Sequence, residues 1–510
     1  MADFDLAIIG GGINGVGIAR DAAGRGLKVL LVEQNDLASG TSSASTKLIH
    51  GGLRYLAQGA FRLVREALAE REVLLRIAPH LVRPMRFVLP AEASDRPAWM
   101  LYLGLFLYDW MGGRRTLAGR KTIDFKVDAA GAPLKRHFGT GFEYSDCTVD
   151  DSRLVVLNAV DAAARGASIR TRTRCLRAER SGEWTLMLDA RGRRDVATAR
   201  VLVNAAGPWL ATLAETVLRL DHPLPVRLVK GSHIVVKRLF DHGRAYILPT
   251  ADRRFVFARP FGPDFTLIGT TDEDFAGDPA APAVQAHEVA YLCDVINGYF
   301  RQQIVPDDVI WAFAGIRALY DDQVRDAKDT TREYVLTLDQ SFREAPLLTV
   351  YGGKITTYRR LAEEALERLS PYLRSAKARQ GWTAKSPLPG GDLDVSAIAA
   401  LTAELVRSYP FLSAAHANRL AHAYGTRASK LLGNAKSMAD LGQSFGATLT
   451  ESEVRYLMSS EWACTADDIV WRRSKLGLRL SPTEIAAIDD WIAAHHVASD
   501  RPLLEAGGRT

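Results

Sequence analysis

Cysteine is scarce in this chain, and its placement excludes several kinds of site. None of the four cysteines belongs to a C-x-x-C pair or to a cluster with the spacing of metal ligands. We therefore expect reduced and mostly buried thiols, with no disulfide, no metal and no iron–sulfur or haem group. The four are Cys147, Cys175, Cys293 and Cys464.

Long apolar runs are also missing. The longest spans residues 99–108, whereas a helix that crosses a bilayer needs about 20 residues. We interpret this run as a buried helix, with a surface that dips into a membrane interface as the alternative. The N-terminus begins with a strand-like stretch rather than a basic and apolar leader, so we expect an intracellular protein.

A strong excess of charge is absent too. The chain has 65 Lys and Arg against 59 Asp and Glu, a formal net charge of +6. This balance is compatible with an anionic substrate, an anionic membrane surface or nucleic acid. Because the basic residues are dispersed and no recognition motif is present, we expect no nucleic-acid partner.

What the chain does have is a glycine-rich turn near its N-terminus. A short apolar run leads into G-x-G-x-x-G at Gly10, Gly12 and Gly15, and a helix-forming stretch follows. In a dinucleotide-binding unit the first glycine makes the tight turn, the second lets backbone approach a pyrophosphate, and the third lets helix and strand pack closely. A second apolar strand ends in Glu33. In a dinucleotide-binding unit an acidic residue at this position binds the ribose hydroxyls. The pattern predicts a dinucleotide at the positive end of the helix.

A polar loop follows this unit. Residues 36–55 are rich in serine, threonine and glycine, and they end with His50, Arg54 and Tyr55 around a glycine pair. Such a loop suits a cofactor, because hydroxyls and backbone amides can meet phosphate or ring edges.

The order of strand and helix patterns predicts a discontinuous first domain. Residues 201–209 resemble a further parallel strand of the first sheet, and residues 347–354 return to that domain. Between them, residues 221–333 alternate as short antiparallel strands, whereas residues 394–502 have helical periodicity. We predict a nucleotide-binding domain at 1–95, 145–215 and 335–375, a substrate domain at 96–144 and 216–334, and a helical domain at 388–510.

Six blocks of the sequence resemble one family, the FAD-dependent, respiratory-chain sn-glycerol-3-phosphate dehydrogenases of the bacterial aerobic type. The resemblance implies an α/β FAD-binding Rossmann-like domain of the glutathione-reductase or amine-oxidase type, an antiparallel β-rich substrate domain and a C-terminal helical domain. The blocks are residues 8–15, 41–55, 142–147, 230–236, 269–272 and 352–359.

The same resemblance implies an activity and its partners. The protein would oxidise sn-glycerol 3-phosphate to dihydroxyacetone phosphate by hydride transfer to FAD, and would pass electrons to a membrane quinone. It would be cytoplasmic and held peripherally on the anionic cytoplasmic face of the inner membrane. A homodimer is compatible with the chain.

The resemblance also assigns cofactor contacts, residue by residue. Most of them lie in the glycine-rich turn, the polar loop and the turn before residue 356. They are Gly10, Gly12, Asn14, Gly15, Glu33, Thr41, Ser42, Ser45, Lys47, Leu48, Gly207, Gly353, Lys354 and Thr356.

A phosphate monoester carries nearly two negative charges, so its site needs several cations, and the planar Arg side chain suits bidentate contact. By resemblance, the residues at the phosphate end are Arg54, Tyr55, Arg317 and Lys354, with His50 close to them.

Oxidation of a secondary alcohol also needs a base for the hydroxyl proton. Histidine suits this role because its ordinary pKa lies near working pH. His233 is the first candidate and His50 the second, while Arg317 could stabilise a developing alkoxide.

Two other functions fit the same residues. A glycerol-3-phosphate oxidase would pass electrons to oxygen and release peroxide. A flavin-binding module would sense redox state or phosphate metabolites without turnover.

Overall fold

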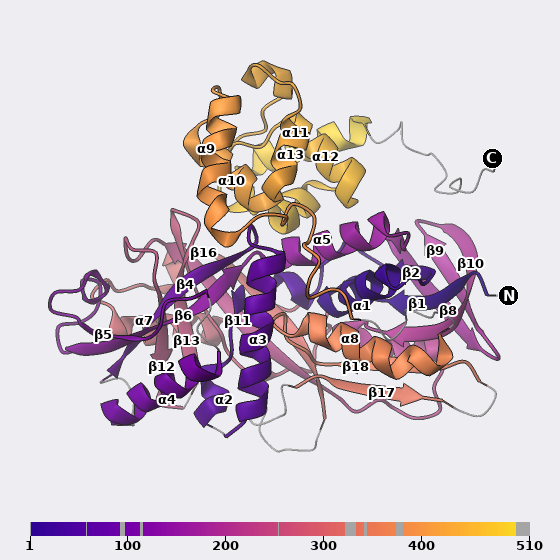
Figure 1. The fold of residues 1–510 in the computed structure, drawn as a ribbon, viewed down its shortest axis with the longest axis horizontal. Coiled ribbons are helices and arrows are strands. Elements are labelled where there is room, and N and C mark those ends of the chain that lie inside the picture. Colours follow the sequence, from indigo (N-terminus) through magenta and orange to yellow (C-terminus); the bar gives the residue numbers. More distant parts are fainter. Residues whose placement is uncertain are drawn as a thin grey trace.

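The computed structural model describes residues 2–57, 59–91, 97–112, 116–252, 254–321, 333–340, 344–373 and 381–495, with the side chains of Arg54 and Ala57 excepted. Two sheets lie side by side, and a helical domain made of the C-terminal residues sits above both of them (Figure 1). The expected combination of a Rossmann-like domain, an antiparallel substrate sheet and a C-terminal helical domain is confirmed.

The first sheet has the order β17-β18-β10-β1-β2-β7, and β9 joins β8 to the edge of β10. Its central strands run parallel: Leu6 of β1 pairs with Val201 of β10 and with Val29 of β2. The two later segments that were expected to return to this sheet do so, as β10 and β18. The strands are β1 (Phe4–Ile9), β2 (Val29–Val32), β7 (Ser168–Arg170), β8 (Thr173–Arg180), β9 (Trp184–Ala190), β10 (Arg193–Asn204), β17 (Val335–Asp339) and β18 (Leu347–Tyr351).

Helix α1 (Ile13–Gly24) packs between α5 (Asp151–Ala164) and α8 (Tyr358–Leu369) on one face of this sheet. The approach of α1 to β1 needs two glycines. Gly10 has φ +120°, a conformation that other residues rarely adopt, and a Cβ on Gly15 would lie 2.0 Å from the Gly10 carbonyl oxygen. The helix N-terminus is thereby held directly at the end of β1. The short helix α6 (Leu210–Leu213) follows β10.

The second sheet has the order β15-β11-β14-β13-β12-β4-β6-β3, with β16 beside β11 and β5 beside β6. It is mostly antiparallel, and α7 (Ala286–Tyr299) packs against β11. The strands are β3 (Leu48–Ile49), β4 (Val82–Pro90), β5 (Lys121–Asp124), β6 (Thr140–Val149), β11 (Val226–Lys237), β12 (Ala245–Pro249), β13 (Phe255–Phe261), β14 (Phe265–Gly269), β15 (Glu273–Asp274) and β16 (Val309–Tyr320).

This sheet reaches further back along the chain than the sequence pattern indicated. Strands β3 and β4 lie within the range 1–95 that we assigned to the nucleotide domain, yet they pair with β6, and β4 also pairs with β12. Alternation of apolar residues identifies a strand but not its partner, and these partners are more than 50 residues away in sequence.

The apolar run at residues 99–108 forms helix α4 (Ala98–Met111), as expected, but the interpretation of a buried helix is wrong. Only Leu105 and Tyr108 of this helix are buried, whereas Trp99 is 65% exposed and Trp110 is 72% exposed. The helix is apolar on every side, so the sequence has no polar face to indicate which side contacts the rest of the protein. Helices α2 (Leu53–Ala57) and α3 (Phe61–Ile77) pack against it from one side.

Crossing a bilayer would require a longer apolar helix than any that the described residues form. The four cysteines are unpaired, and three of them are buried, which confirms the expectation of free thiols.

The C-terminal helical domain has its own apolar core. It rests on α5 and on the loop after β2 through buried ion pairs. Its helices are α9 (Ile398–Ser408), α10 (Ala414–Tyr424), α11 (Ala428–Leu432), α12 (Glu451–Glu461) and α13 (Pro482–His495).

Candidate active site

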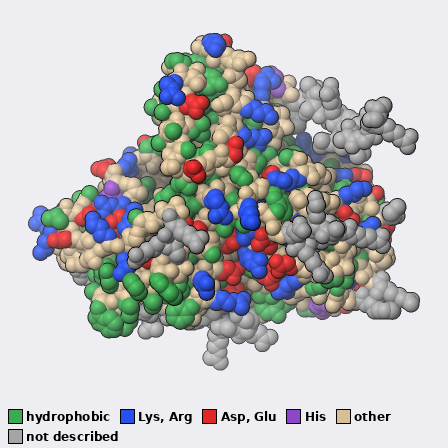
Figure 2. All heavy atoms as spheres, in the orientation of Figure 1, with side chains coloured by type: hydrophobic (Ala, Val, Ile, Leu, Met, Phe, Trp, Pro, Cys, Tyr) green, Lys and Arg blue, Asp and Glu red, His purple; other side chains and the backbone are tan. Residues whose placement is uncertain are grey.

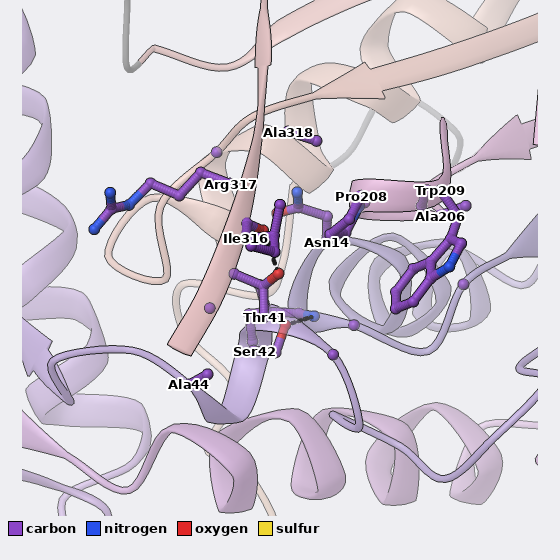
Figure 3. Close-up of a pocket in the computed structure, with 18 of the residues that line it drawn as sticks. Asn14, Thr41, Ser42, Ala44, Ala206, Pro208, Trp209, Ile316, Arg317 and Ala318 are labelled. Carbon is purple, nitrogen blue, oxygen red and sulfur yellow. Dashed lines mark hydrogen bonds between the residues drawn. The ribbon is translucent and has the colours of Figure 1, made fainter. Parts of the chain in front are cut away.

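A deep cavity lies where the two sheets meet. Its walls come from the turn after β1, the polar loop at 39–50, the turn after β10, strand β16 and residues 352–356. Figure 3 shows Arg317 reaching toward one end of the labelled group, with Trp209 at the other end. A single elongated cavity therefore connects the glycine-rich turn with the cations expected at the phosphate end.

The N-terminus of α1 forms one end of this cavity. Ser42 Oγ accepts a hydrogen bond of 3.0 Å from the Ile13 amide, which draws the polar loop over the helix. A Cβ on Gly12 would come within 3.2 Å of that hydroxyl, so a side chain here would crowd Ser42. The arrangement presents the positive helix end to the cavity, as a pyrophosphate requires.

Glu33 lies beside this turn with its carboxylate fixed by backbone. Its two oxygens accept hydrogen bonds from the amides of Gly11 at 2.7 Å and Asn35 at 2.8 Å. Burial raises the pKa of the Glu33 carboxyl, and those two amides oppose the shift. The carboxylate has further lone pairs that can accept from ribose hydroxyls.

Asn14 supplies a second sign that the cavity is built for a polar ligand. Its Nδ2 donates to the Gly352 carbonyl over 3.0 Å, whereas its Oδ1 is buried with no hydrogen-bond partner. A buried acceptor of this kind normally has a partner. The residues present thus fit a dinucleotide with polar groups along its length.

Most residues expected at the cofactor line this cavity, but two do not. Gly15 lies under the turn and allows its close packing. Lys47 is turned away: its Nζ donates to Asp151 Oδ2 and to the Ser43 carbonyl, each over 2.8 Å. Ser45 lines the cavity and also donates to Asp151 Oδ2. The residues that line it are Gly10, Gly12, Asn14, Glu33, Thr41, Ser42, Ser45, Leu48, Gly207, Gly353, Lys354 and Thr356.

The residues expected at the substrate come together at the other end of the same cavity. The ammonium of Lys354 lies 3.8 Å from the ring centroid of Tyr55, a cation–π contact. The His50 amide donates to Thr356 Oγ1 over 3.3 Å, and the His50 ring also lines the cavity. Arg54 lies in α2, and its side chain is outside the described part of the chain.

Arg317 is held at this end by the turn after β14. Its Nη1 donates to Asp272 Oδ1 over 2.5 Å, and its Nη2 donates to Thr270 Oγ1 over 3.3 Å. A Cβ on Gly231 would lie 2.6 Å from that Nη2, so only glycine leaves the guanidinium in this position. The orientation of Arg317 is therefore set by the turn and by β11.

His233, on β11, also lines the cavity. Its Nε2 is 2.9 Å from Thr46 Oγ1, and its Nδ1 is buried with no partner. Burial and the positive charges of Lys47 and Arg317 lower the pKa of His233 to about 3. The imidazole is thus neutral at working pH and able to accept a proton. From the sequence we expect this because of an ordinary histidine pKa, whereas in the structure burial and nearby cations keep the ring neutral.

Three neighbours of these residues were not among the sequence candidates: Thr46, Asp272 and Phe313. Phe313 stacks on His233 with a centroid distance of 4.9 Å. One signal for Phe313 was present in the sequence, because residues 311, 313, 315 and 317 alternate along one strand and share a face with Arg317. The partner of Arg317, Asp272, could not be read in this way, since it lies in the turn after β14 and not on this strand.

Comparison with known proteins matches both parts of the chain. The model of the FAD dependent oxidoreductase family matches residues 5–359, and the C-terminal domain of alpha-glycerophosphate oxidase matches residues 382–494. A glycerol-3-phosphate dehydrogenase of Pseudomonas aeruginosa is 52% identical over 99% of this chain and 97% of its own length. The aerobic glycerol-3-phosphate dehydrogenase of Escherichia coli is 47% identical over 97% of this chain and 98% of its own.

Two further relatives bear on the cofactor and on the substrate. The solved structure of the glycerol-3-phosphate dehydrogenase from Bacillus halodurans, complexed with FAD, is 25% identical. It superposes with a TM-score of 0.73 over 99% of this chain and 97% of its own. The D-erythritol 1-phosphate dehydrogenase of Brucella abortus is 46% identical over 96% of this chain and 97% of its own. At 47–52% identity to these dehydrogenases over nearly its whole length, and with the glycine turn, Glu33 and the cations in one cavity, the chain belongs to the FAD-dependent glycerol-3-phosphate dehydrogenase family.

Proposed function

We propose that this FAD-dependent oxidoreductase oxidises sn-glycerol 3-phosphate to dihydroxyacetone phosphate and passes the electrons to a membrane quinone. The observation that carries the proposal is the shared cavity, in which Arg317, Lys354 and His233 face the same space as the N-terminus of α1. Relatives at 47–52% identity are glycerol-3-phosphate dehydrogenases, which supports this substrate. The relative from Escherichia coli is an aerobic enzyme, which supports a respiratory electron acceptor.

Each residue has a definable task in this reaction. Arg317 and Lys354 offer two positive charges to the phosphate, and Asp272 keeps the Arg317 guanidinium oriented. His233 accepts the hydroxyl proton at its neutral imidazole. When bound, FAD would supply the acceptor for the hydride that leaves the carbon bearing that hydroxyl.

The substrate has one specific competitor. Because a D-erythritol 1-phosphate dehydrogenase is 46% identical over nearly the whole chain, a longer polyol phosphate is the second candidate. Both substrates carry a phosphate monoester and a secondary hydroxyl, so the cation cluster serves either. The length of the polyol distinguishes them.

Anaerobic mixing of the purified holoenzyme with each polyol phosphate tests this function. Loss of the yellow flavin band within one turnover of sn-glycerol 3-phosphate supports the proposal, and Arg317→Ala should slow it strongly. Faster bleaching by erythritol 1-phosphate would reassign the substrate, whereas no bleaching by either would leave a flavin-binding sensor. Reoxidation by a soluble quinone analogue against oxygen then separates a dehydrogenase from an oxidase.

Helix α4 is the proposed contact with the membrane. Figure 2 shows apolar side chains gathered at the lower left, over the position of α4 in Figure 1. The Arg120 guanidinium lies 4.5 Å from the ring centroid of Tyr102 and 4.6 Å from that of Phe106, so a cation borders the apolar surface. Aromatic and apolar side chains beside a cation suit an anionic bilayer interface. The exposed residues are Trp99, Met100, Tyr102, Leu103, Phe106 and Trp110.

A further inference from the structure

One short segment joins the C-terminal domain to the walls of the active site. Residues 471–475, called here the docking segment, lie at the end of a π-helical turn, Asp468–Arg473, and just beyond it. π-Helical turns are rare and are enriched at functional sites. Two side chains of this segment are connected to residues of the catalytic cavity through chains of contacts, one aromatic and one charged.

The aromatic route leads from Trp471 to the candidate base. Trp471 stacks on Trp311 at a centroid distance of 4.7 Å, and Trp311 lies 4.6 Å from Phe313. Phe313 in turn stacks on His233 at 4.9 Å with an interplanar angle of 9°. Phe313 and His233 are paired across β16 and β11, so the stack continues the face of the sheet that lines the cavity.

The chain makes room for Trp471 in a specific way. A Cβ on Gly477 would lie 2.6 Å from the Trp471 ring. A side chain at position 477 would require that ring or the backbone around it to shift. The Trp471 ring is therefore packed between Trp311 on one side and the backbone of Gly477 on another.

The charged route leads from Lys475 to the polar loop. Lys475 Nζ donates to Ser152 Oγ over 2.7 Å and to Asp151 Oδ1 over 3.4 Å. The other oxygen of Asp151 accepts from Lys47 Nζ and from Ser45 Oγ, each over 2.8 Å. Lys47 Nζ lies 5.2 Å from the ring centroid of Phe313, so this route ends at the same aromatic ring as the first.

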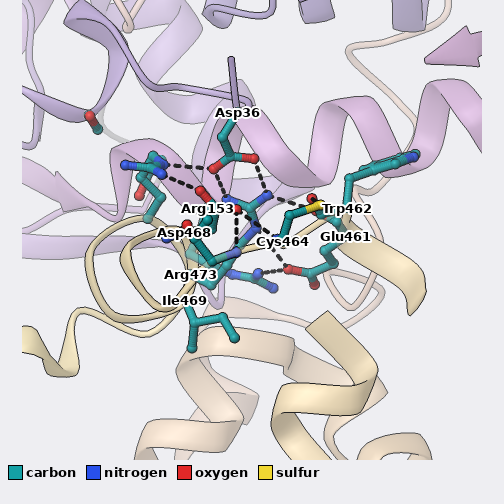
Figure 4. A network of polar contacts seen from close by, with 12 residues as sticks. Asp36, Arg153, Glu461, Trp462, Cys464, Asp468, Ile469 and Arg473 are labelled. Carbon is teal, nitrogen blue, oxygen red and sulfur yellow. Dashed lines mark hydrogen bonds and ion pairs between the residues drawn. The ribbon is translucent and has the colours of Figure 1, made fainter. Parts of the chain in front are cut away.

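A set of buried ion pairs fixes the docking segment itself. Arg473 donates two hydrogen bonds of 2.8 Å to the Asp36 carboxylate, and Arg472 Nε donates a third of 2.7 Å to the same carboxylate. Figure 4 shows this network beside the pair of Arg153 with Glu461. Asp36 lies three residues beyond Glu33, so the C-terminal domain is anchored at the loop that begins the cofactor site.

We propose that Trp471 and Lys475 are positioning residues for the oxidation, because together they hold Phe313 and so fix the ring of His233 above the reacting alcohol. This inference rests on the proposed function, since it concerns the base of that reaction. His233 has Thr46 at its Nε2 and Phe313 on its face. Loss of the support behind Phe313 lets the imidazole tilt, and small misplacements of a base cost rate rather than binding.

The test compares Trp471→Leu, which removes the stack, with Trp471→Phe, which keeps a ring against Trp311. Trp491→Leu is the matched control, because Trp491 lies in the core of the same domain and packs on Phe445 and His495. Each holoenzyme is measured for the anaerobic rate of flavin reduction by sn-glycerol 3-phosphate, the KM for that substrate, the Kd for FAD by flavin fluorescence, and thermal unfolding.

We expect Trp471→Leu to slow flavin reduction about tenfold or more, with KM and the FAD Kd within about twofold of wild type and Trp471→Phe restoring most of the rate. Equal rates in Trp471→Leu and wild type would overturn the inference, as would an equal loss in Trp491→Leu. If Trp471→Leu does not fold, Lys475→Met tests the charged route by the same measurements, and an unchanged reduction rate in it overturns the proposal. Failure of wild type to be reduced would instead count against the proposed function.

Discussion

Arg317 and Asp272 form an ion pair in which the Arg317 Nη1 donates to Asp272 Oδ1 over 2.5 Å, between β16 and the turn after β14. The side chain of Asp272 is only 6% exposed, whereas that of Arg317 is 26% exposed and reaches the cavity. The buried carboxylate thus orients a cation that a substrate can still approach.

This pairing gives different outcomes for the two partners. Arg317→Ala should lower kcat/KM by about 10²- to 10³-fold, through a higher KM and a lower kcat, because both charge and orientation are lost. Asp272→Asn should cost less, since the guanidinium stays but is held more loosely. Steady-state kinetics check both, and unchanged kinetics in Arg317→Ala would remove it from the site.

Substituting each of the two cavity histidines distinguishes the general base from the histidine that only lies near the substrate. His233→Gln should lower the rate of flavin reduction by about 10²- to 10⁴-fold with little change in KM, because general base catalysis is lost. His50→Gln should raise KM more than it lowers that rate, because His50 lines the cavity together with Tyr55 and Lys354, the residues proposed to hold the phosphate. Stopped-flow reduction measures both, and a reversal of the two patterns would make His50 the base.

Glu33 should control cofactor affinity rather than chemistry. Glu33→Gln keeps an oxygen for the Gly11 amide but loses the charge that strengthens hydrogen bonds to ribose hydroxyls. We expect the Kd for FAD to rise by about tenfold, corresponding to about 1.4 kcal/mol. The kcat at saturating FAD should stay within about twofold. Flavin fluorescence on titration of the apoprotein measures the Kd, and an unchanged value would place the ribose elsewhere.

The membrane contact can be tested with matched surface variants. Changing Trp99, Phe106 and Trp110 to Ser should weaken binding to anionic phosphatidylglycerol vesicles by about tenfold or more, since large apolar surfaces leave the bilayer. The control changes the exposed Leu176, Met187 and Val196 to Ser, on β8, β9 and β10. Vesicle flotation measures binding, and equal retention of both variants would exclude α4 as the anchor.

Stability should fall in acid because of buried neutral histidines. Burial lowers the pKa of His80 to about 3 and that of His422 to about 4, and the His422 Nδ1 lies 3.3 Å from the His80 carbonyl. Between pH 6.5 and about 4 the unfolded chain binds protons that the folded chain does not, so the free energy of unfolding decreases as pH falls. Above pH 6.5 these histidines are neutral in both the folded and the unfolded protein, so they no longer lower the free energy of unfolding.

His80→Leu removes one of these protonations. We expect it to reduce the dependence of the free energy of unfolding on pH by about 1.4 kcal/mol per pH unit in that window. Urea unfolding followed between pH 4 and pH 7 measures the slope. An identical slope in wild type and His80→Leu would mean that His80 is protonated in the folded protein.

Much of this molecule could be predicted from local pattern. The glycine spacing placed α1 at the end of β1, because a tight turn and close packing depend on a few consecutive residues. The position of Glu33 followed from the same unit. The domain order was also readable, since helical and strand periods differ.

Other features depended on which segments meet. Helix α4 is apolar on all sides, and the placement of α2 and α3 decided which side is covered and which is exposed. Lys47 looked like a ligand of the cofactor, but Asp151, more than 100 residues later, draws its ammonium into a buried pair. The neutral state of His233 likewise arises from burial against Phe313 and from nearby cations.

The sequence by itself determined the nucleotide-binding turn, the order of the domains and the set of cations and histidines available for chemistry, because these follow from residue type and short-range spacing. The tertiary structure alone decided which cations share a cavity, which carboxylate orients Arg317 and how the docking segment reaches His233. Those relations join residues far apart in the chain, and strand pairing and burial, which local periodicity does not encode, bring them together.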